Sequence, residues 1–280
     1  MLKRLWHRLP FTPEPPPMIH IVPMEGVIAA AGRSSRSLNL SAVEGALEKA
    51  FKTGEPRAVL LSINSPGGSP VQSRMILQKV RDLSVEHKVP VIAHIQDVGA
   101  SGGYMLALAG DEIYADPFAL VGSIGVIAGG FGLHEAIGRL GIERRVYTAG
   151  ENKSQLDPFR PEDPRDVAHL KGILDKSHAL FIDLVKTRRG DRLKGEDKIV
   201  FTGDFWIADE AQALGLIDGV EDRDALLKRR FGDRVQSRSF DVDKRSLLSR
   251  LLSGTMPGAW RPEAVAAALE DKALWGRFGR

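Results

Sequence analysis

Residues 89–110, VPVIAHIQDVGASGGYMLALAG, predict a buried β-strand that runs through a short turn directly into a helix. The run VPVIAHIQ is apolar enough for a strand covered on both faces, as in a parallel sheet. The turn from Gly99 to Gly103 has almost no side-chain bulk, and Ser101 is its only polar side chain. Two explanations fit a lone serine among small residues at this turn. The helix packs tightly on the sheet with Ser101 as its N-cap, or Ser101 is a nucleophile that a large substrate must reach.

The same order of strand, turn and helix recurs along the chain. Further strands are predicted at 18–30, 58–63, 112–115 (EIYA) and 143–150 (ERRVYTAG). Helices are predicted after Ser69, after Ser101, at HEAIGRLG (134–141) and over 163–189, where apolar residues recur at helical spacing. This alternation indicates an α/β fold with a mostly parallel sheet.

Composition divides the chain into three predicted segments. Residues 1–17 form a basic, Pro-rich N-terminal tail, and residues 18–232 form one α/β domain. Residues 233–280 are expected to be a helical C-terminal extension, because SLLSRLL (246–252) has amphipathic spacing.

Charge and residue types exclude several functions. The 280 residues carry a net charge of +3, which is too small to indicate a nucleic-acid partner. The chain has no cysteine, which removes disulfides, thiolate metal sites and a cysteine nucleophile. We expect neither a metal nor a cofactor.

No targeting segment is predicted. Arg8 and Pro10 interrupt the start of the chain before an apolar signal core can form, and the uncharged stretch 118–133 is short and rich in glycine. We therefore expect a cytoplasmic protein. The excess of basic residues in 234–280 would suit peripheral contact with an anionic membrane.

The stretch INSPGGS (63–69) predicts a second turn after a buried strand. Gly67 and Gly68 leave their backbone N–H groups without side chains in front of them. Such groups can stabilise an oxyanion, although Pro-Gly-Gly is also ordinary turn chemistry. Ser69 is expected to cap a helix that begins at Pro70.

A nucleophilic serine needs a base, and none of the seven histidines lies in a motif that marks it as one. Lys153, in ENKSQLDPF (151–159), is the other candidate, in a loop flanked by Leu156 and Phe159. A lysine amine acts as a base only when burial lowers its pKa well below the reference of about 10.4. Otherwise a loop lysine is a solvated charge.

Four motifs occur in order and with compatible spacing: INSPGGS, GASGGYMLALAGDEIYADPFALVGSIGVI, ENKSQLDPF and FTGDFWIADEAQALGLIDGV. Together they resemble the signal peptide peptidase A (SppA/SohB-like) family of serine peptidases, over about residues 18–230. The resemblance implies the Clp protease/crotonase fold, a spiral of β-β-α units. It also implies that Ser101 is the nucleophile and Lys153 the general base.

By the same resemblance, Ser123 orients the lysine, and the backbone N–H groups of Gly68 and Gly102 form the oxyanion hole. A buried turn serine is the other explanation of Ser123. Short members of the family build each Ser–Lys dyad from neighbouring subunits, so we expect a homo-oligomeric ring. The implied activity is that of a serine endopeptidase acting on peptides, unfolded proteins or membrane-derived, signal-peptide-like segments.

Two other functions fit the same fold. A crotonase-type enzyme acting on acyl-CoA shares the paired oxyanion N–H groups but has no use for a Ser–Lys pair. A catalytically inactive ring that scaffolds membrane proteins needs neither Ser101 nor Lys153. The presence of both residues favours the peptidase.

Overall fold

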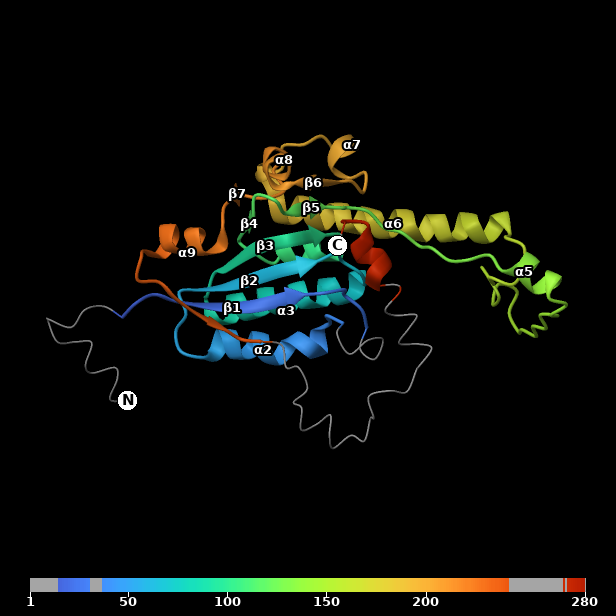
Figure 1. Cartoon of the computed structure of the whole chain (residues 1–280), viewed down its shortest axis with the longest axis horizontal. Coiled ribbons are helices and arrows are strands. Elements are labelled where there is room, and N and C mark those ends of the chain that lie inside the picture. The colour runs from blue at the N-terminus through green and yellow to red at the C-terminus, as the bar shows by residue number, and fades with distance from the viewer. Residues whose placement is uncertain (1–14, 31–36, 242–268, 270, 280) are drawn as a thin grey trace, which may run out of the picture.

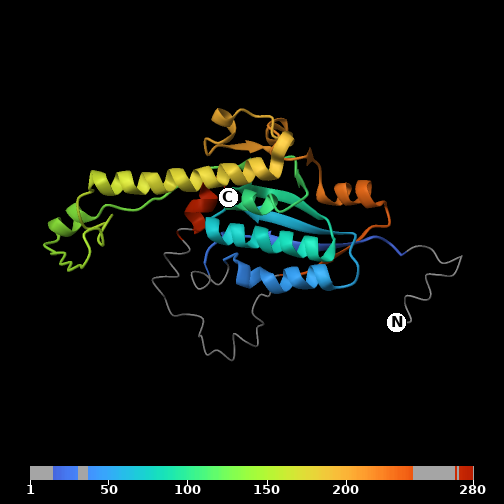
Figure 2. The same ribbon diagram turned by 180° about the vertical axis from the view of Figure 1, so that it is seen from behind.

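The computed structural model describes residues 15–30, 37–241, 269 and 271–279. Helices pack against a central sheet, and a long arm projects beyond it (Figures 1 and 2). The arm contains α5 (His134–Arg139), the loops on either side of it and the first half of α6 (Pro164–Arg189). The described chain therefore has a body, built on the sheet, and an arm.

Eight strands of the described chain form one sheet. Its path is β6-β5-β3-β2-β1-β8, and β4 pairs with β3 and with β7. Every pair is parallel except β5 with β6. The strands are β1 (Met18–Glu25), β2 (Ala58–Ser65), β3 (Val91–Ala100), β4 (Glu112–Ala115), β5 (Leu120–Gly122), β6 (Phe205–Ile207), β7 (Gly219–Val220) and β8 (Gln236–Ser239). The predicted α/β class with a mostly parallel sheet is confirmed.

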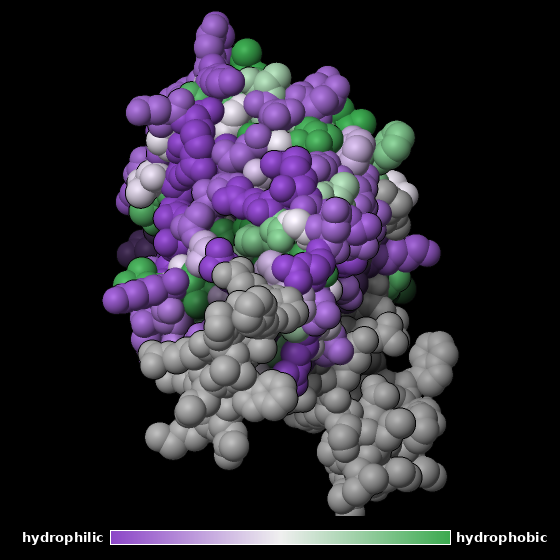
Figure 3. Space-filling model, turned by 90° about the vertical axis from the view of Figure 1, so that its left-hand side faces the viewer, coloured by the Kyte–Doolittle hydropathy of each residue, from purple (hydrophilic) through white to green (hydrophobic). Residues whose placement is uncertain are grey.

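Helices cover the sheet on both faces. The others besides α5 and α6 are α2 (Leu40–Lys52), α3 (Pro70–His87), α4 (Gly102–Ala107), η1 (Gly190–Arg192), α7 (Asp197–Val200), α8 (Ala208–Ala213) and α9 (Arg223–Phe231). Figure 2 shows α2, α3 and α4 against one face. The end of the body at α9, seen end-on in Figure 3, presents mostly hydrophilic side chains.

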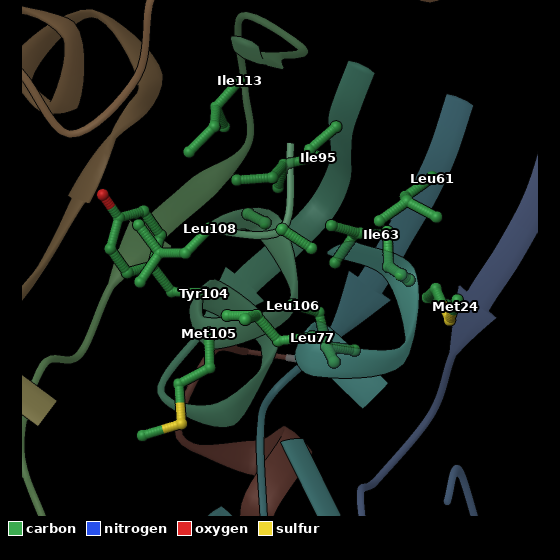
Figure 4. Close-up of a cluster of buried hydrophobic side chains, with 14 of the residues drawn as sticks. Met24, Leu61, Ile63, Leu77, Ile95, Tyr104, Met105, Leu106, Leu108 and Ile113 are labelled. Carbon is green, nitrogen blue, oxygen red and sulfur yellow. The ribbon is translucent and has the colours of Figure 1, made fainter. Parts of the chain in front are cut away.

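Side chains alternate between two cores along the central strands. Leu61 and Ile63 of β2 point into the larger cluster, with side chains of α3 and α4 (Figure 4). Leu60 points into the smaller cluster, with Leu226 and Leu227 of α9. Burial on both faces explains the continuous apolar runs in the sequence.

The long strand β3 pairs with two different partners along its length. Its residues Ile92–Ile95 pair with β4, whereas Val98–Ala100 pair with β5. The register against β2 shifts between Ile63 and Ser65, which indicates a bulge that redirects the end of β3. As a result Ala100 lies beside Gly122 at the end of β5.

Three sequence predictions differ from the structure in the described residues. The strand predicted at 18–30 ends at Glu25. ERRVYTAG (143–150) forms no strand, because it lies in the exposed arm without a neighbouring strand to satisfy its backbone groups. Residues 236–239, which we expected within a helical extension, form β8 and pair in parallel with β1, whereas residues 271–276 of the same extension are helical. Residues 246–252 lie outside the described residues, and the division into three segments stays a prediction.

A buried ion pair anchors the end of α6 to the body. Arg189 donates to both carboxylate oxygens of Asp218, at 2.9 and 3.0 Å, and to the carbonyl of Gly215 at 2.8 Å. Asp218 also accepts from the backbone N–H of Ile113 on β4. Burial by itself would raise the pKa of Asp218, but the hydrogen bonds from Arg189 and Ile113 outweigh it and lower that pKa.

We predict that Asp218→Asn lowers the free energy of unfolding at pH 7 by about 3 kcal/mol, because it leaves the buried charge of Arg189 unpaired. A carboxylate whose folded pKa is depressed stabilises the protein above its unfolded pKa of about 3.9, and this contribution is lost as the pH falls through the folded value. The difference between wild type and variant in denaturant titrations should therefore shrink below about pH 4. Glu135→Gln, which breaks an exposed pair with Arg139 in the arm, is the control and should change little. An equal effect of both variants would contradict the prediction.

Candidate active site

Ser101 lies in a strained turn between β3 and α4. Its φ of 52° and ψ of −120° fall in a region that residues other than glycine rarely adopt, at a cost of about 1–3 kcal/mol. Its hydroxyl makes no capping hydrogen bond to α4, so the structure does not support the N-cap explanation. Ser101 is half-buried, whereas all six residues of α4 are buried. The turn therefore holds one accessible hydroxyl at the carboxyl edge of the sheet.

The turns after β2 and β3 fit against each other because both lack side chains. A Cβ atom on Gly67 would lie 2.7 Å from the backbone nitrogen of Gly102 and 2.7 Å from the Cβ atom of Ser101. A Cβ atom on Gly102 would lie 3.3 Å from the backbone nitrogen of Gly68. The structure thus brings Gly68, Gly102 and Ser101 together at one place.

The backbone N–H groups of Gly68 and Gly102 are available for a ligand. Neither donates a hydrogen bond to another described residue, although the flanking N–H groups of Gly67 and Ser69 do. Two N–H groups at adjoining turns beside a hydroxyl form the arrangement that an oxyanion hole requires. Their role stays a prediction.

Residues that the sequence analysis did not single out hold these turns in place. Ser65 donates to the carbonyl of Gly26 at 2.7 Å and accepts from the N–H of Gly67. Ile28 pairs with the turn from the other side, accepting from Ser69 and donating to Gly67. Ser73, in the first turns of α3, is fully buried, with its Oγ against Gly102. Ser69 is confirmed as the N-cap of α3. The position of Ser73 one helical turn after this cap is the feature of the sequence that could have pointed to it.

Ser123 follows β5 directly and lies beside the turn that holds Ser101. The carbonyl of the preceding residue, Gly122, accepts from the N–H of Ser101 at 2.8 Å. Ser123 is buried, has a φ of 51° and donates its N–H to the carbonyl of Asp204. The structure therefore places Ser123 next to Ser101 along the sheet edge, and its role in orienting a lysine stays a prediction.

Lys153 does not join this group within one chain. It is exposed in a turn between α5 and α6, and Figures 1 and 2 show that this segment lies at the tip of the arm, away from the sheet. The turn is tied to the start of α6, where the N–H of Leu156 donates to Asp166. A single chain supplies the predicted lysine and the predicted serine at separate places.

The structure shows no histidine bonded to Ser101 among the described residues. His178 of α6 comes near the site, but its Nε2 lies 3.0 Å from the carbonyl oxygen of Ile124. His94 is buried along β3 and contacts the carbonyl of Glu221. Nor do three His, Asp or Glu side chains come together in the described residues to hold a metal ion.

Comparison with known proteins agrees with this geometry. Residues 84–232 match the profile of Peptidase family S49. The chain is 30% identical over 176 residues to the probable protease SohB of Haemophilus influenzae, covering 63% of this chain and 49% of that protein. It is 47% identical over 272 residues to a Brucella abortus protein named Na(+)/H(+) antiporter NhaA, covering 93% of this chain and 37% of that protein. The chain thus spans less than half the length of either relative.

A solved structure shows the same fold. A membrane-bound stomatin-specific protease with a substrate peptide aligns over 85% of this chain and 97% of its own, with a TM-score of 0.50 and 17% identity. The chain belongs to peptidase family S49, a family of serine peptidases, and has the predicted Clp protease/crotonase-like fold. In the parts of the chain that the structure describes, no helix has the length and apolarity needed to cross a membrane.

We predict that Gly68→Ala lowers the free energy of unfolding by about 1–3 kcal/mol, because φ is +135° there and a Cβ atom would lie 2.0 Å from the carbonyl oxygen of Ile28. Gly172→Ala in α6 is the matched control, since nothing lies within 4 Å of its Cβ position. That variant should be more stable by about 0.5–1 kcal/mol, because alanine favours a helix interior. Denaturant titration of both variants measures the difference, and an unchanged stability of Gly68→Ala would show that the turn is looser than described.

Proposed function

We propose that this chain is a serine endopeptidase in which Ser101 is the nucleophile and Lys153 the general base. The observation that carries the proposal is the accessible, uncapped hydroxyl of Ser101 in a strained turn beside two unpaired backbone N–H groups. Strain of this kind persists only where the surrounding structure holds it, and it clusters at functional sites. Membership of family S49 favours a peptidase over an acyl-CoA enzyme.

The proposed chemistry proceeds through an acyl-enzyme. The neutral amine of Lys153 takes the proton of Ser101 while Oγ forms a bond to the substrate carbonyl carbon. The N–H groups of Gly68 and Gly102 donate to the oxyanion that develops. Collapse of the tetrahedral intermediate breaks the C–N bond, and the lysine passes the proton that it took from Ser101 to the leaving amine. Water then cleaves the ester with the same lysine as base, and Ser123 orients the lysine throughout.

The lysine is proposed to come from a neighbouring copy of the chain. No residue from 125 to 163 is buried, and the arm exposes large apolar side chains, among them Phe131 at 84% and Tyr147 at 91%. Apolar exposure of this extent on a projecting segment is typical of an interface. Docking of the arm on the next body would bury these side chains and the lysine together. A head-to-tail contact of this kind closes into a ring.

Substrates are proposed to be peptides or unfolded segments, including membrane-derived ones. The side-chain-free turns let an extended backbone approach Ser101, and a substrate strand could add beside residues 67–70. Two comparisons support this: the structural neighbour carries a substrate peptide, and the Brucella relative contains a matching region within a longer chain named as an antiporter. The cytoplasmic location, with peripheral contact to a membrane, stays a prediction.

We predict that Ser101→Ala abolishes hydrolysis of casein and of fluorogenic peptides, because the covalent route is lost. Folding should be nearly unchanged, since the hydroxyl does not cap α4. A fluorophosphonate should label the wild-type chain on the peptide that contains Ser101, and should not label the variant. Ser177→Ala in α6 is the control and should keep full activity. Turnover by purified Ser101→Ala would exclude Ser101 as nucleophile, and hydrolysis of a CoA thioester without casein cleavage would identify the acyl-CoA enzyme instead.

We also predict that Ser101→Ala and Lys153→Ala chains, each inactive alone, regain activity when they are co-expressed and purified as mixed oligomers through two different tags. With random mixing, about a quarter of the sites in a closed head-to-tail ring would contain both wild-type residues. Mixed oligomers that form but stay inactive would place the dyad within one chain. The control mixture combines Ser101→Ala with Lys171→Ala, a change of an α6 lysine outside the proposed site. It should be active, because the Lys171→Ala chains supply a wild-type Ser101 and every chain supplies a wild-type Lys153.

A further inference from the structure

The last described residues of the chain pack against β3, the strand that leads into Ser101. Phe278 is only 7% exposed and forms a cluster with Val98 and Ala100 of β3, both fully buried. Leu120 of β5 and Trp275 complete the cluster. Figures 1 and 2 both show the C-terminal segment beside the sheet, at the side from which the arm leaves.

This contact covers the face of β3 that the core helices leave open. A Cβ atom on Gly99 would meet the side chain of Ile95, which belongs to the larger core cluster. Side chains alternate along a strand, so Val98 and Ala100 point to the opposite face. In the described chain, the residues from outside the sheet that join their cluster are Trp275 and Phe278.

The same contact reaches two further strands. Val98 is paired with Leu120, and Ala100 with Gly122, whose carbonyl holds the N–H of Ser101. The ring of Phe278 also meets the ring of Phe205 on β6 in an edge-on arrangement, with centroids 5.0 Å apart. Phe278 therefore covers the junction of β3, β5 and β6 at the residues that lead into the nucleophile turn.

We propose that Phe278, supported by Trp275, is a positioning residue for Ser101, an inference that rests on the proposed function of Ser101 as nucleophile. The conformation of Ser101 is unfavourable and has to be held from both sides. The Gly67 turn holds one side, and the Ser101 to Gly122 hydrogen bond holds the other. That bond depends on β5, a strand of three residues, remaining in register with β3. Phe278 packs across both strands and keeps them in register.

The test compares Phe278→Ala, Phe278→Leu and a matched control, Phe240→Ala, in the full chain. Phe240 is 8% exposed, and its ring contacts the ring of His20 on β1 in a tilted arrangement, away from β3 and β5. The first set of measurements gives kcat and KM for hydrolysis of a peptide and the rate at which a fluorophosphonate labels Ser101. The other is hydrogen exchange of the Ser101 N–H, at a temperature where every variant is folded.

For Phe278→Ala we expect a loss in kcat and in labelling rate of tenfold or more, a change in KM below twofold, and at least tenfold faster exchange of the Ser101 N–H. Phe278→Leu should keep most of the wild-type kcat, labelling rate and protection of the Ser101 N–H from exchange. Phe240→Ala should leave these three quantities unchanged. Unchanged exchange in Phe278→Ala overturns the proposal. So does faster labelling, which would mean that the C-terminal segment obstructs the site. If the wild-type chain is not labelled at all, the proposed function fails, while the exchange measurement still decides whether Phe278 holds the turn.

Discussion

The close approach of two turns without side chains governs the carboxyl edge of the sheet. Gly67 lies so near Ser101 and Gly102 that a single added Cβ atom would clash with both. The approach is possible because β2 and β3 are adjacent parallel strands, whose ends emerge at the same edge. The pairing of Ile28 with the first turn and of Gly122 with Ser101 then holds each turn from its outer side.

The proposed catalytic groups lie in two different parts of the chain, the body and the arm. The body holds the hydroxyl and the N–H donors on a sheet that is buried on both faces, which makes their geometry rigid. The arm carries the lysine among exposed side chains and has no packing of its own against the sheet. In the proposed ring, the same contact that buries the apolar arm also delivers and dehydrates the lysine. Assembly and activity would then depend on one interface.

Two segments beyond residue 235 return to strands from the first half of the chain. Residues 236–239 form an edge strand against β1, and Phe278 covers the end of β3. Neither return has a strong local signal. The sequence QSRS lacks the apolar alternation of a half-buried strand, because all four residues are exposed at the sheet edge. The aromatic residues near the C-terminus are apolar but carry no information about which surface they cover.

The sequence by itself determined the parts of the fold and site that depend on neighbouring residues. The buried strands predicted at 58–63 and 89–96, the cap formed by Ser69 and Pro70, and the side-chain-free turns at Gly67 and Ser101 follow from local apolar runs and glycine positions, whereas the extension of β3 to Ala100 depends on its pairing with β5. Tertiary structure decided the rest: that residues 143–150 form no strand, that Ser73 lies against Gly102, and that Lys153 is far from Ser101 in its own chain. The physical reason is that a strand, a buried contact and a catalytic pair each need a partner distant in sequence, and local periodicity does not specify that partner.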